Sequence, residues 1–278
     1  MRLVILLFIA CATAVASPLG PDGTAGQRLP GKVVWLDLAT ENPAYSRTFY
    51  GEVFGWTFRE VPGAPAGYTL IENGGTKVGG LFRQARPAGT YVSARWLTLI
   101  SVRDAEAAAR VVREQGGEVL VAPKRVQGRG VHAVFRDPEG AVFGVLAAEG
   151  GDPDDTPVND GEVFWIDLFS RDPAKAAAFY ADLAGYEVEV GQIQGRMRTV
   201  LATNGIARAG VANLPGGAVK AAWLPYILVD DVPATLGRVR AAGGRIVMQP
   251  RADLLGGNVA VIADPQGGAL GIVNWVAP

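Results

Sequence analysis

Apolar and polar residues alternate strictly along residues 33–38, which predicts a β-strand with two unlike faces. One face carries Val34, Leu36 and Leu38, and the other carries Trp35 and Asp37. The first face is the one expected to pack on an amphipathic helix. The second face places an indole and a carboxylate side by side.

This strand opens a unit whose other elements follow in a fixed order. Asn42 and Pro43 predict the start of a helix, and Gly55 predicts its end. Two extended segments come next, and Asn73-Gly74 predicts the hairpin that leads into the last strand. The unit therefore reads strand, helix, strand, strand, strand.

The unit occurs four times along the chain. Its second copy begins at Trp96, and the second half of the chain repeats the first half at spacings of 130 and 127 residues. Repetition at constant spacing predicts a tandem architecture. The matched pairs include Trp35 with Trp165, Asp37 with Asp167, Tyr50 with Tyr180, Trp96 with Trp223, Asp137 with Asp264 and Gly144 with Gly271.

These repeats divide the chain into two domains, at residues 31–148 and 161–278. Residues 149–160 read as an acidic linker whose aspartates lack the ligand spacing of a calcium loop, so we expect them to face solvent. Residues 17–30 are rich in Gly and Pro and predict a flexible lead-in.

The N-terminal residues 1–16 have the features of a secretory signal peptide. Arg2 precedes an apolar run, and small residues precede Ser17. We therefore expect export to the periplasm or the medium. A lipoprotein anchored through Cys11 remains the alternative, although Phe8 is a poor match to that motif. Cys11 is the only cysteine, so the mature chain would hold no disulfide.

The composition narrows the function classes. Hydrophobic residues make up 49% of the chain, charged residues 19%, and the formal net charge is −1, which is typical of a globular protein without a nucleic-acid face. Beyond the N-terminus, no apolar stretch approaches the ~20 residues of a membrane-spanning helix. The expected partner is a small molecule.

The repeated motifs resemble those of a known family. They are Phe49-Tyr50 with Phe54-Gly55-Trp56, their counterparts at Phe179-Tyr180 and Gly185-Tyr186, and the two Asp-Pro-x-Gly turns followed by Gly144 and Gly271. The chain resembles the glyoxalase/bleomycin resistance/dioxygenase (vicinal oxygen chelate) superfamily, and most of all its two-domain glyoxalase-like or hydroxylase-like members. The resemblance implies an α+β fold in which four βαβββ modules pair into two tandem domains. Each domain would have a curved mixed sheet, with helices on the convex face and a ligand cup on the concave face.

The resemblance also implies which side chains line each cup. The first cup would contain Trp35, Asp37, Trp96 and Thr98, and the second would contain Trp165, Asp167, Trp223 and Pro225. Because a buried carboxylate needs a partner, Arg59, Arg196 and Arg198 are candidates to pair with Asp37 or Asp167.

Members of the family usually bind a divalent metal through His or Glu on the first strand of each unit and Glu on the last strand. Here the first-strand place holds Trp35 or Trp165, and the last-strand place holds Gly144 or Gly271. The chain has a single histidine, so one chain cannot form a two-histidine iron site. We therefore predict no metal cofactor, and a cation held by Asp37 or Asp167 alone would be under-ligated.

Two functions remain open. The first is a metal-independent binding protein for an apolar or aromatic small molecule, with tryptophan walls and an aspartate that holds the polar end of the ligand. The second is a lyase- or hydroxylase-like enzyme with Asp37 or Asp167 as the acid–base group. His132 is a further candidate base or a structural residue, and its presence favours the first half as the working one. We expect a monomer in which the two halves replace the dimer of single-domain relatives.

Overall fold

The computed structural model describes residues 19–23, 26–62, 64, 67–85, 93–193, 196–216 and 220–275, without the side chains at 192, 193, 196 and 197. The predicted signal peptide, including Cys11, lies outside the described residues, as does the side chain of Arg196.

The described chain forms two mixed sheets of eight strands, one from each half, and so confirms the predicted α+β fold of paired βαβββ modules. The first sheet runs β2-β3-β4-β1-β5-β8-β7-β6, and the second runs β10-β11-β12-β9-β13-β16-β15-β14. The strands of the first are β1 (Val33–Thr40), β2 (Thr57–Glu60), β3 (Thr69–Asn73), β4 (Thr76–Arg83), β5 (Ala94–Ser101), β6 (Glu118–Val126), β7 (Gly130–Arg136) and β8 (Val142–Ala148). Those of the second are β9 (Val163–Ser170), β10 (Glu187–Ile193), β11 (Arg196–Thr203), β12 (Ile206–Asn213), β13 (Ala222–Leu228), β14 (Arg245–Met248), β15 (Val259–Ala263) and β16 (Ala269–Val273).

One helix belongs to each module, and its ends follow from the local sequence. The helices are α1 (Pro43–Phe54), α2 (Ala105–Glu114), α3 (Pro173–Ala184) and α4 (Val232–Ala241). In α1 the Asn42 side chain accepts a hydrogen bond from the Tyr45 amide, and Gly55 ends the helix at φ 74°. A left-handed residue after the last turn is the conformation that favours glycine. The predicted cap and stop are thus confirmed.

The first strand differs from simple alternation at its start. Leu36 and Leu38 pack with the α1 residues as predicted, but Val34 packs with Trp35 on the opposite, concave side. The pairing of β1 with β5 shifts register between Val33 and Trp35, as at a β-bulge. An extra residue at a bulge turns the residues next to it to the other face of the sheet. The predicted helix-facing position of Val34 is therefore wrong.

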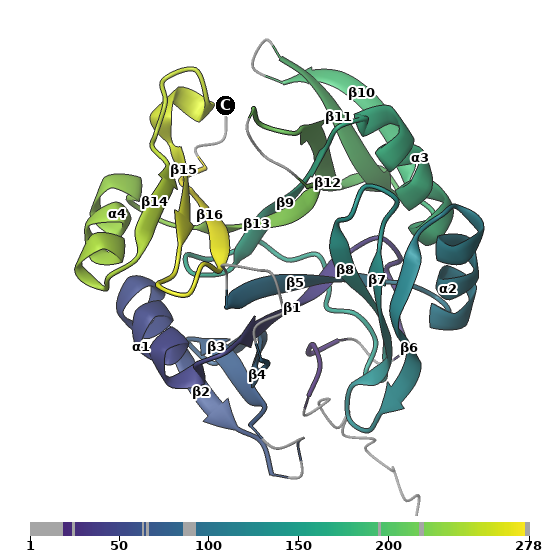
Figure 1. Ribbon diagram of the computed structural model, residues 1–278, viewed down its shortest axis with the longest axis horizontal. Coiled ribbons are helices and arrows are strands. Elements are labelled where there is room, and N and C mark those ends of the chain that lie inside the picture. Colours follow the sequence, from purple (N-terminus) through teal and green to yellow (C-terminus); the bar gives the residue numbers. More distant parts are fainter. Residues whose placement is uncertain are drawn as a thin grey trace, which may run out of the picture.

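The two halves pack back to back through their helices. In Figure 1, α1 lies beside α4 and α2 beside α3, with the central strands of both sheets between these pairs. Each of the two large cores contains buried residues of both halves. The two concave faces therefore open away from each other, at the lower and upper sides of the view in Figure 1.

Each half reaches into the other through a buried hydrogen bond. Tyr50 of α1 donates to Asp264 in the second half at 3.1 Å, and Tyr180 of α3 donates to Asp137 in the first half at 3.1 Å. Both aspartates belong to the Asp-Pro-x-Gly turns and also accept hydrogen bonds from backbone amides of those turns. The Asp-Pro-x-Gly turns, which are among the motifs of the family resemblance, thus also join the domains.

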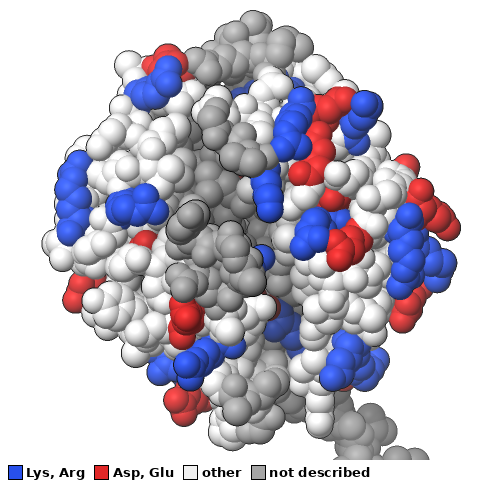
Figure 2. All heavy atoms as spheres, viewed as in Figure 1, with Lys and Arg blue, Asp and Glu red and all other residues white. Residues whose placement is uncertain are grey.

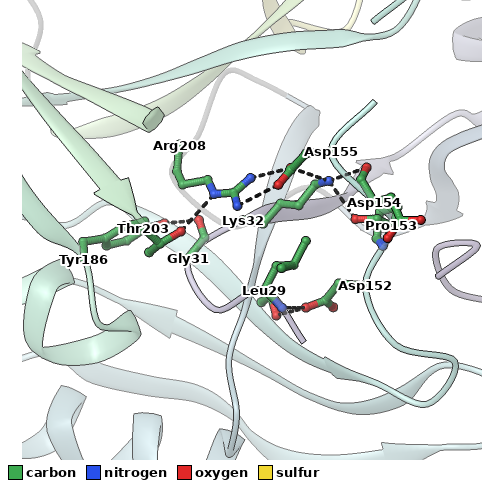
Figure 3. Close-up of polar contacts among 11 residues, drawn as sticks. Leu29, Gly31, Lys32, Asp152, Pro153, Asp154, Asp155, Tyr186, Thr203 and Arg208 are labelled. Carbon is green, nitrogen blue, oxygen red and sulfur yellow. Dashed lines mark hydrogen bonds and ion pairs between the residues drawn. The ribbon is translucent and has the colours of Figure 1, made fainter. Parts of the chain in front are cut away.

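The linker and the lead-in are packed together, as Figure 3 shows. Asp152 is fully buried and accepts hydrogen bonds from the Leu29 amide at 2.6 Å and the Ser101 hydroxyl at 2.5 Å. Asp155 pairs with Lys32 and Arg208, and these hydrogen bonds lower its pKa to about 2. The interpretation of the linker aspartates as solvated is therefore wrong for Asp152, which the lead-in and β5 partner, whereas Asp155 stays exposed while it forms its ion pairs.

The described surface has mixed charge. On the face shown in Figure 2, Lys and Arg lie among Asp and Glu rather than in a field of one sign. None of the described helices has the length and apolarity needed to cross a membrane.

Candidate functional site

The first cup contains a closed polar tetrad around Asp37. The Trp35 indole donates to Asp37 Oδ1 at 3.0 Å, and the Tyr68 hydroxyl lies 3.0 Å from the same oxygen. Arg129 Nη2 lies 2.5 Å from Asp37 Oδ2, and its Nη1 donates to Tyr68 at 3.0 Å. The side chains of Asp37 and Arg129 are each 7% exposed. A carboxylate with all of these donors is satisfied within the protein.

Three separate elements assemble this tetrad. Trp35 and Asp37 come from β1, Tyr68 lies just before β3, and Arg129 lies in the turn between β6 and β7. Gly80 of β4 makes room for them, because a Cβ there would lie 2.0 Å from the Tyr68 hydroxyl and 2.7 Å from Asp37 Oδ1. A side chain at this glycine is incompatible with the tetrad.

His132 lies on β7, and its neighbours Ala133 and Phe135 face the helix-side core. Alternation along the strand therefore places His132 on the concave face. Burial, followed by the nearby Arg129 charge, lowers its pKa, so the imidazole is neutral near pH 7. Its Nδ1 is buried without a hydrogen-bond partner among the described residues. The structure thus brings His132 into the first cup.

The second cup holds the same residue types in a looser arrangement. The Trp165 indole donates to Asp167 Oδ1 at 2.9 Å, and Tyr226 is hydrogen-bonded to Asp167. Arg198 Nη1 lies 4.0 Å from Asp167 Oδ2, which is too long for a hydrogen bond. The Arg198 side chain is 33% exposed, whereas Arg129 is almost fully buried.

The two tetrads are built from non-equivalent positions. At the spacing of the internal repeat, Arg198 occupies the position of Tyr68, and Tyr226 occupies the position of Leu99. Both cups nevertheless surround their aspartate with an indole, a phenol and a guanidinium. Only the Trp-x-Asp strand is therefore shared, and the phenol and the guanidinium of each cup come from different positions of the repeat.

The walls of the second cup are apolar and incompletely buried. Leu224 and Tyr226 form a small buried cluster with Val259 and Val273. Half-buried side chains surround it, and they are Phe164, Trp165, Phe169, Met248, Leu254, Leu255 and Val261. Half-buried apolar side chains around one polar group are typical of a small-molecule site.

The placement of several predicted site residues is corrected by the structure. Trp96 and Trp223 lie on the helix side. The Trp96 indole donates a hydrogen bond to the Tyr50 hydroxyl and the Trp223 indole donates one to the Tyr180 hydroxyl, each at 2.9 Å. Thr98 lies two residues beyond Trp96 on the same face and is buried. The predicted cup-facing positions of Trp96, Thr98 and Trp223 are wrong. The strand register places them opposite Leu38, Leu36 and Leu168, and directly opposed residues share a face, here the helix side. Pro225 follows Trp223 onto that face.

The arginine partners were partly identified from the sequence. Arg59 forms an exposed ion pair with Glu72 on a neighbouring strand, and Arg198 lies beside Asp167 as expected. Sequence reasoning missed Tyr68, Arg129 and Tyr226. A useful signal was present for Arg129, because Gly128-Arg129-Gly130 is a tight turn that carries one large side chain.

The donors in the cups do not fit a family-type metal. No group of three or more His, Cys, Asp or Glu side chains occurs among the residues that the structure describes. Each cup has one carboxylate on its first strand, and an indole, a phenol and a guanidinium already surround it. A guanidinium beside the only carboxylate opposes the binding of a cation.

Asp167 gives the second cup a distinct dependence on pH. Burial raises its pKa above the usual 3.8. The folded protein then binds this proton more tightly than the unfolded chain does, so its stabilising contribution is present below 3.8 and is lost as pH rises through the raised pKa. We expect Asp167→Asn to become more stable relative to the wild type between about pH 4 and pH 7. Urea unfolding at several pH values measures this difference, and a difference that stays constant with pH would contradict it.

Comparison with known proteins agrees with the fold of the two halves. Residues 32–145 match the model of the Glyoxalase/Bleomycin resistance protein/Dioxygenase superfamily, and residues 164–273 match a glyoxalase-like domain. The anthracycline biosynthesis protein DnrV of Streptomyces peucetius is 33% identical over 262 residues, which cover 88% of this chain and 94% of DnrV.

Two solved structures show the same fold at low identity. The Mn(II)-bound glyoxalase from Novosphingobium aromaticivorans has a TM-score of 0.60 and 18% identity, covering 88% of this chain and 82% of its own. An extradiol ring-cleaving dioxygenase from B. fuscum has a TM-score of 0.58 and 15% identity, covering 93% of this chain and 75% of its own. With family models matched in both halves and a long relative of this identity, the chain belongs to the glyoxalase/bleomycin resistance protein/dioxygenase superfamily.

Proposed function

We propose that this protein binds a small molecule without a metal ion, and that its principal site is the concave face of the second half. The observation that carries the proposal is the incompletely paired Asp167 among half-buried apolar side chains. In the first cup the equivalent Asp37 has its full set of donors from the protein. The free energy of binding is most favourable where polar groups of the site still lack partners and its apolar walls are still hydrated.

The ligand that fits these walls is apolar or aromatic with one polar end. Trp165 offers an indole face, and Arg198 and Asp167 offer a donor and a carboxyl group at one end of the site. The name of DnrV refers to anthracycline biosynthesis. Anthracycline-type compounds are therefore suitable first probes for this chain.

Binding should depend on Trp165 and Asp167 in the second half. We expect Trp165→Ala to weaken binding of a probe by about tenfold, the scale of one lost aromatic contact. Asp167→Asn should weaken the binding of probes with a polar end more than that of their apolar analogues. Isothermal titration calorimetry on the metal-free protein measures both effects. The control is Lys175→Ala, which breaks an exposed ion pair at the start of α3, on the helix side of the second half. Unchanged affinity in both site variants would refute the proposal.

An enzymatic function is the second candidate, and the raised pKa of Asp167 is the observation that favours it. A buried carboxyl group that keeps its proton longer can serve as a general acid or base in a lyase- or hydroxylase-like reaction. Loss of turnover in Asp167→Asn with binding retained would distinguish this function from binding alone.

We also propose export of the protein, on the composition of residues 1–16. The N-terminal residue of the protein recovered from the cell envelope or the medium tests this, and Ser17 is the expected result.

A further inference from the structure

A short segment of the lead-in bridges the two arms of the first sheet. This segment, residues 19–22, is called the strap here. The Leu19 amide donates to the carbonyl of Gly128 at 3.0 Å, in the turn between β6 and β7. Lys77 of β4 contacts the Gly20 carbonyl at 3.4 Å and Asp22 at 2.6 Å. In the strand order, β4 and the β6–β7 hairpin lie on opposite sides of β1, so the strap spans the concave face.

The strap lies directly against the arginine of the first tetrad. A Cβ on Gly20 would lie 3.4 Å from the Arg129 carbonyl oxygen and 3.8 Å from Arg129 Cγ. Leu19, Gly20 and Pro21 are buried, although they precede the first strand. Figure 1 shows this purple segment below the first sheet, between the β4 and β6 arms. The Asp37–Arg129 pair is therefore covered by the chain itself.

The second cup has no equivalent cover from the linker. The segment 130 residues after the strap begins at Glu149, and it turns toward the lead-in instead. There the backbone amide of Asp152 donates to the Gln27 carbonyl, and the Asp152 carboxylate accepts from the Leu29 amide. The linker is therefore used to hold the lead-in in place. Without such a cover from the linker, the Arg198 side chain in the second cup is 33% exposed.

We propose that the strap closes a second, covered binding site in the first cup, for the same class of aromatic ligand with a polar end. The site contains the Asp37–Arg129 pair, Tyr68 and His132, whose Nδ1 lacks a partner among the described groups. When the strap is in place, only the second cup takes ligand. The ligand class rests on the function proposed above, whereas the closure rests on the strap contacts alone.

The chain offers a native reporter of closure, because His132 is its only histidine. Carbethoxylation of a neutral imidazole by diethyl pyrocarbonate is followed by absorbance and needs no added label. The test variant is Leu19→Ser/Asp22→Ala, which loosens the strap without changing a residue of the cup. The matched control is Lys175→Ala, in an exposed ion pair at the start of α3 in the second half.

In the wild type and the control, we expect slow modification of His132 and one equivalent of an anthracycline-type probe per chain by calorimetry. In the strap variant, modification should be at least several-fold faster, and two equivalents should bind. An unchanged rate overturns the closure. A faster rate with a stoichiometry that stays at one overturns the covered site. Probe binding that fails in all proteins, with the rate difference intact, refutes the proposed function and the ligand class but leaves the closure standing.

Discussion

Replacement of Arg129 by methionine is expected to lower the free energy of unfolding by about 3–5 kcal/mol, the usual result of removing one partner of a buried ion pair. Asp37 would remain buried as an uncompensated charge, and Tyr68 would lose the donor that fixes its hydroxyl. Urea denaturation near pH 7 measures the change. Because Arg129 also lies over the rings of Trp35 and Tyr68, methionine preserves part of the apolar contact and isolates the loss of charge.

Arg198→Met is the matched control in the second half. Its guanidinium is one-third exposed and 4.0 Å from Asp167, so the expected cost is below about 1 kcal/mol. The double variant Arg129→Met/Asp37→Leu should recover much of the stability, since an apolar pair leaves no buried charge. Equal losses for Arg129→Met and Arg198→Met would contradict the distinction between a closed and an open tetrad.

Replacement of Asp264 by alanine is expected to cost about 2–3 kcal/mol, because hydrogen bonds to a charged group contribute about that much. The carboxylate accepts from the Tyr50 hydroxyl of the other half and from the backbone amides of Gln266 and Gly268. Tyr50 in turn accepts from the Trp96 indole, so one substitution breaks a buried chain that crosses the domain interface. Thermal unfolding followed by tryptophan fluorescence measures the loss.

Tyr50→Phe separates the interdomain bond from the turn. This substitution keeps the hydrogen bonds from backbone amides to Asp264 and removes only the Tyr50 hydroxyl. We therefore expect the free energy of unfolding to fall by about 1 kcal/mol. The symmetric pair Asp137→Ala and Tyr180→Phe should follow the same order, since Asp137 accepts from Tyr180 in the same way. If Tyr50→Phe cost as much as Asp264→Ala, the turn bonds would contribute nothing, contrary to their 2.8 Å lengths.

The asymmetry of the two cups changes which half is the better candidate for function. The single histidine favours the first half when the sequence alone is considered. In the structure, that half has a satisfied tetrad beneath the strap, whereas the second has an aspartate with an incomplete cation partner and open apolar walls. Sequence symmetry is strong, but equal residue types do not imply equal access.

The sequence by itself determined the repeat, the four modules and the alternation that puts Trp35 and Asp37 on one face of their strand. Those properties follow from local rules, since period-two alternation, helix caps and turn residues act over a few positions. The error at Val34 shows where these local rules end, because a bulge depends on the pairing with a partner strand.

Only the tertiary structure decided which groups surround each aspartate. Arg129 lies 92 residues from Asp37 in the chain, and no pattern of spacing links them. Trp96 and Trp223 share a sequence motif with Trp35 and Trp165, yet the strand register places them opposite Leu38 and Leu168, on the helix side. The strap, likewise, is a Gly- and Pro-rich segment with no pattern of its own, and it is placed by contacts with Lys77 and Gly128 that only the folded sheet brings together.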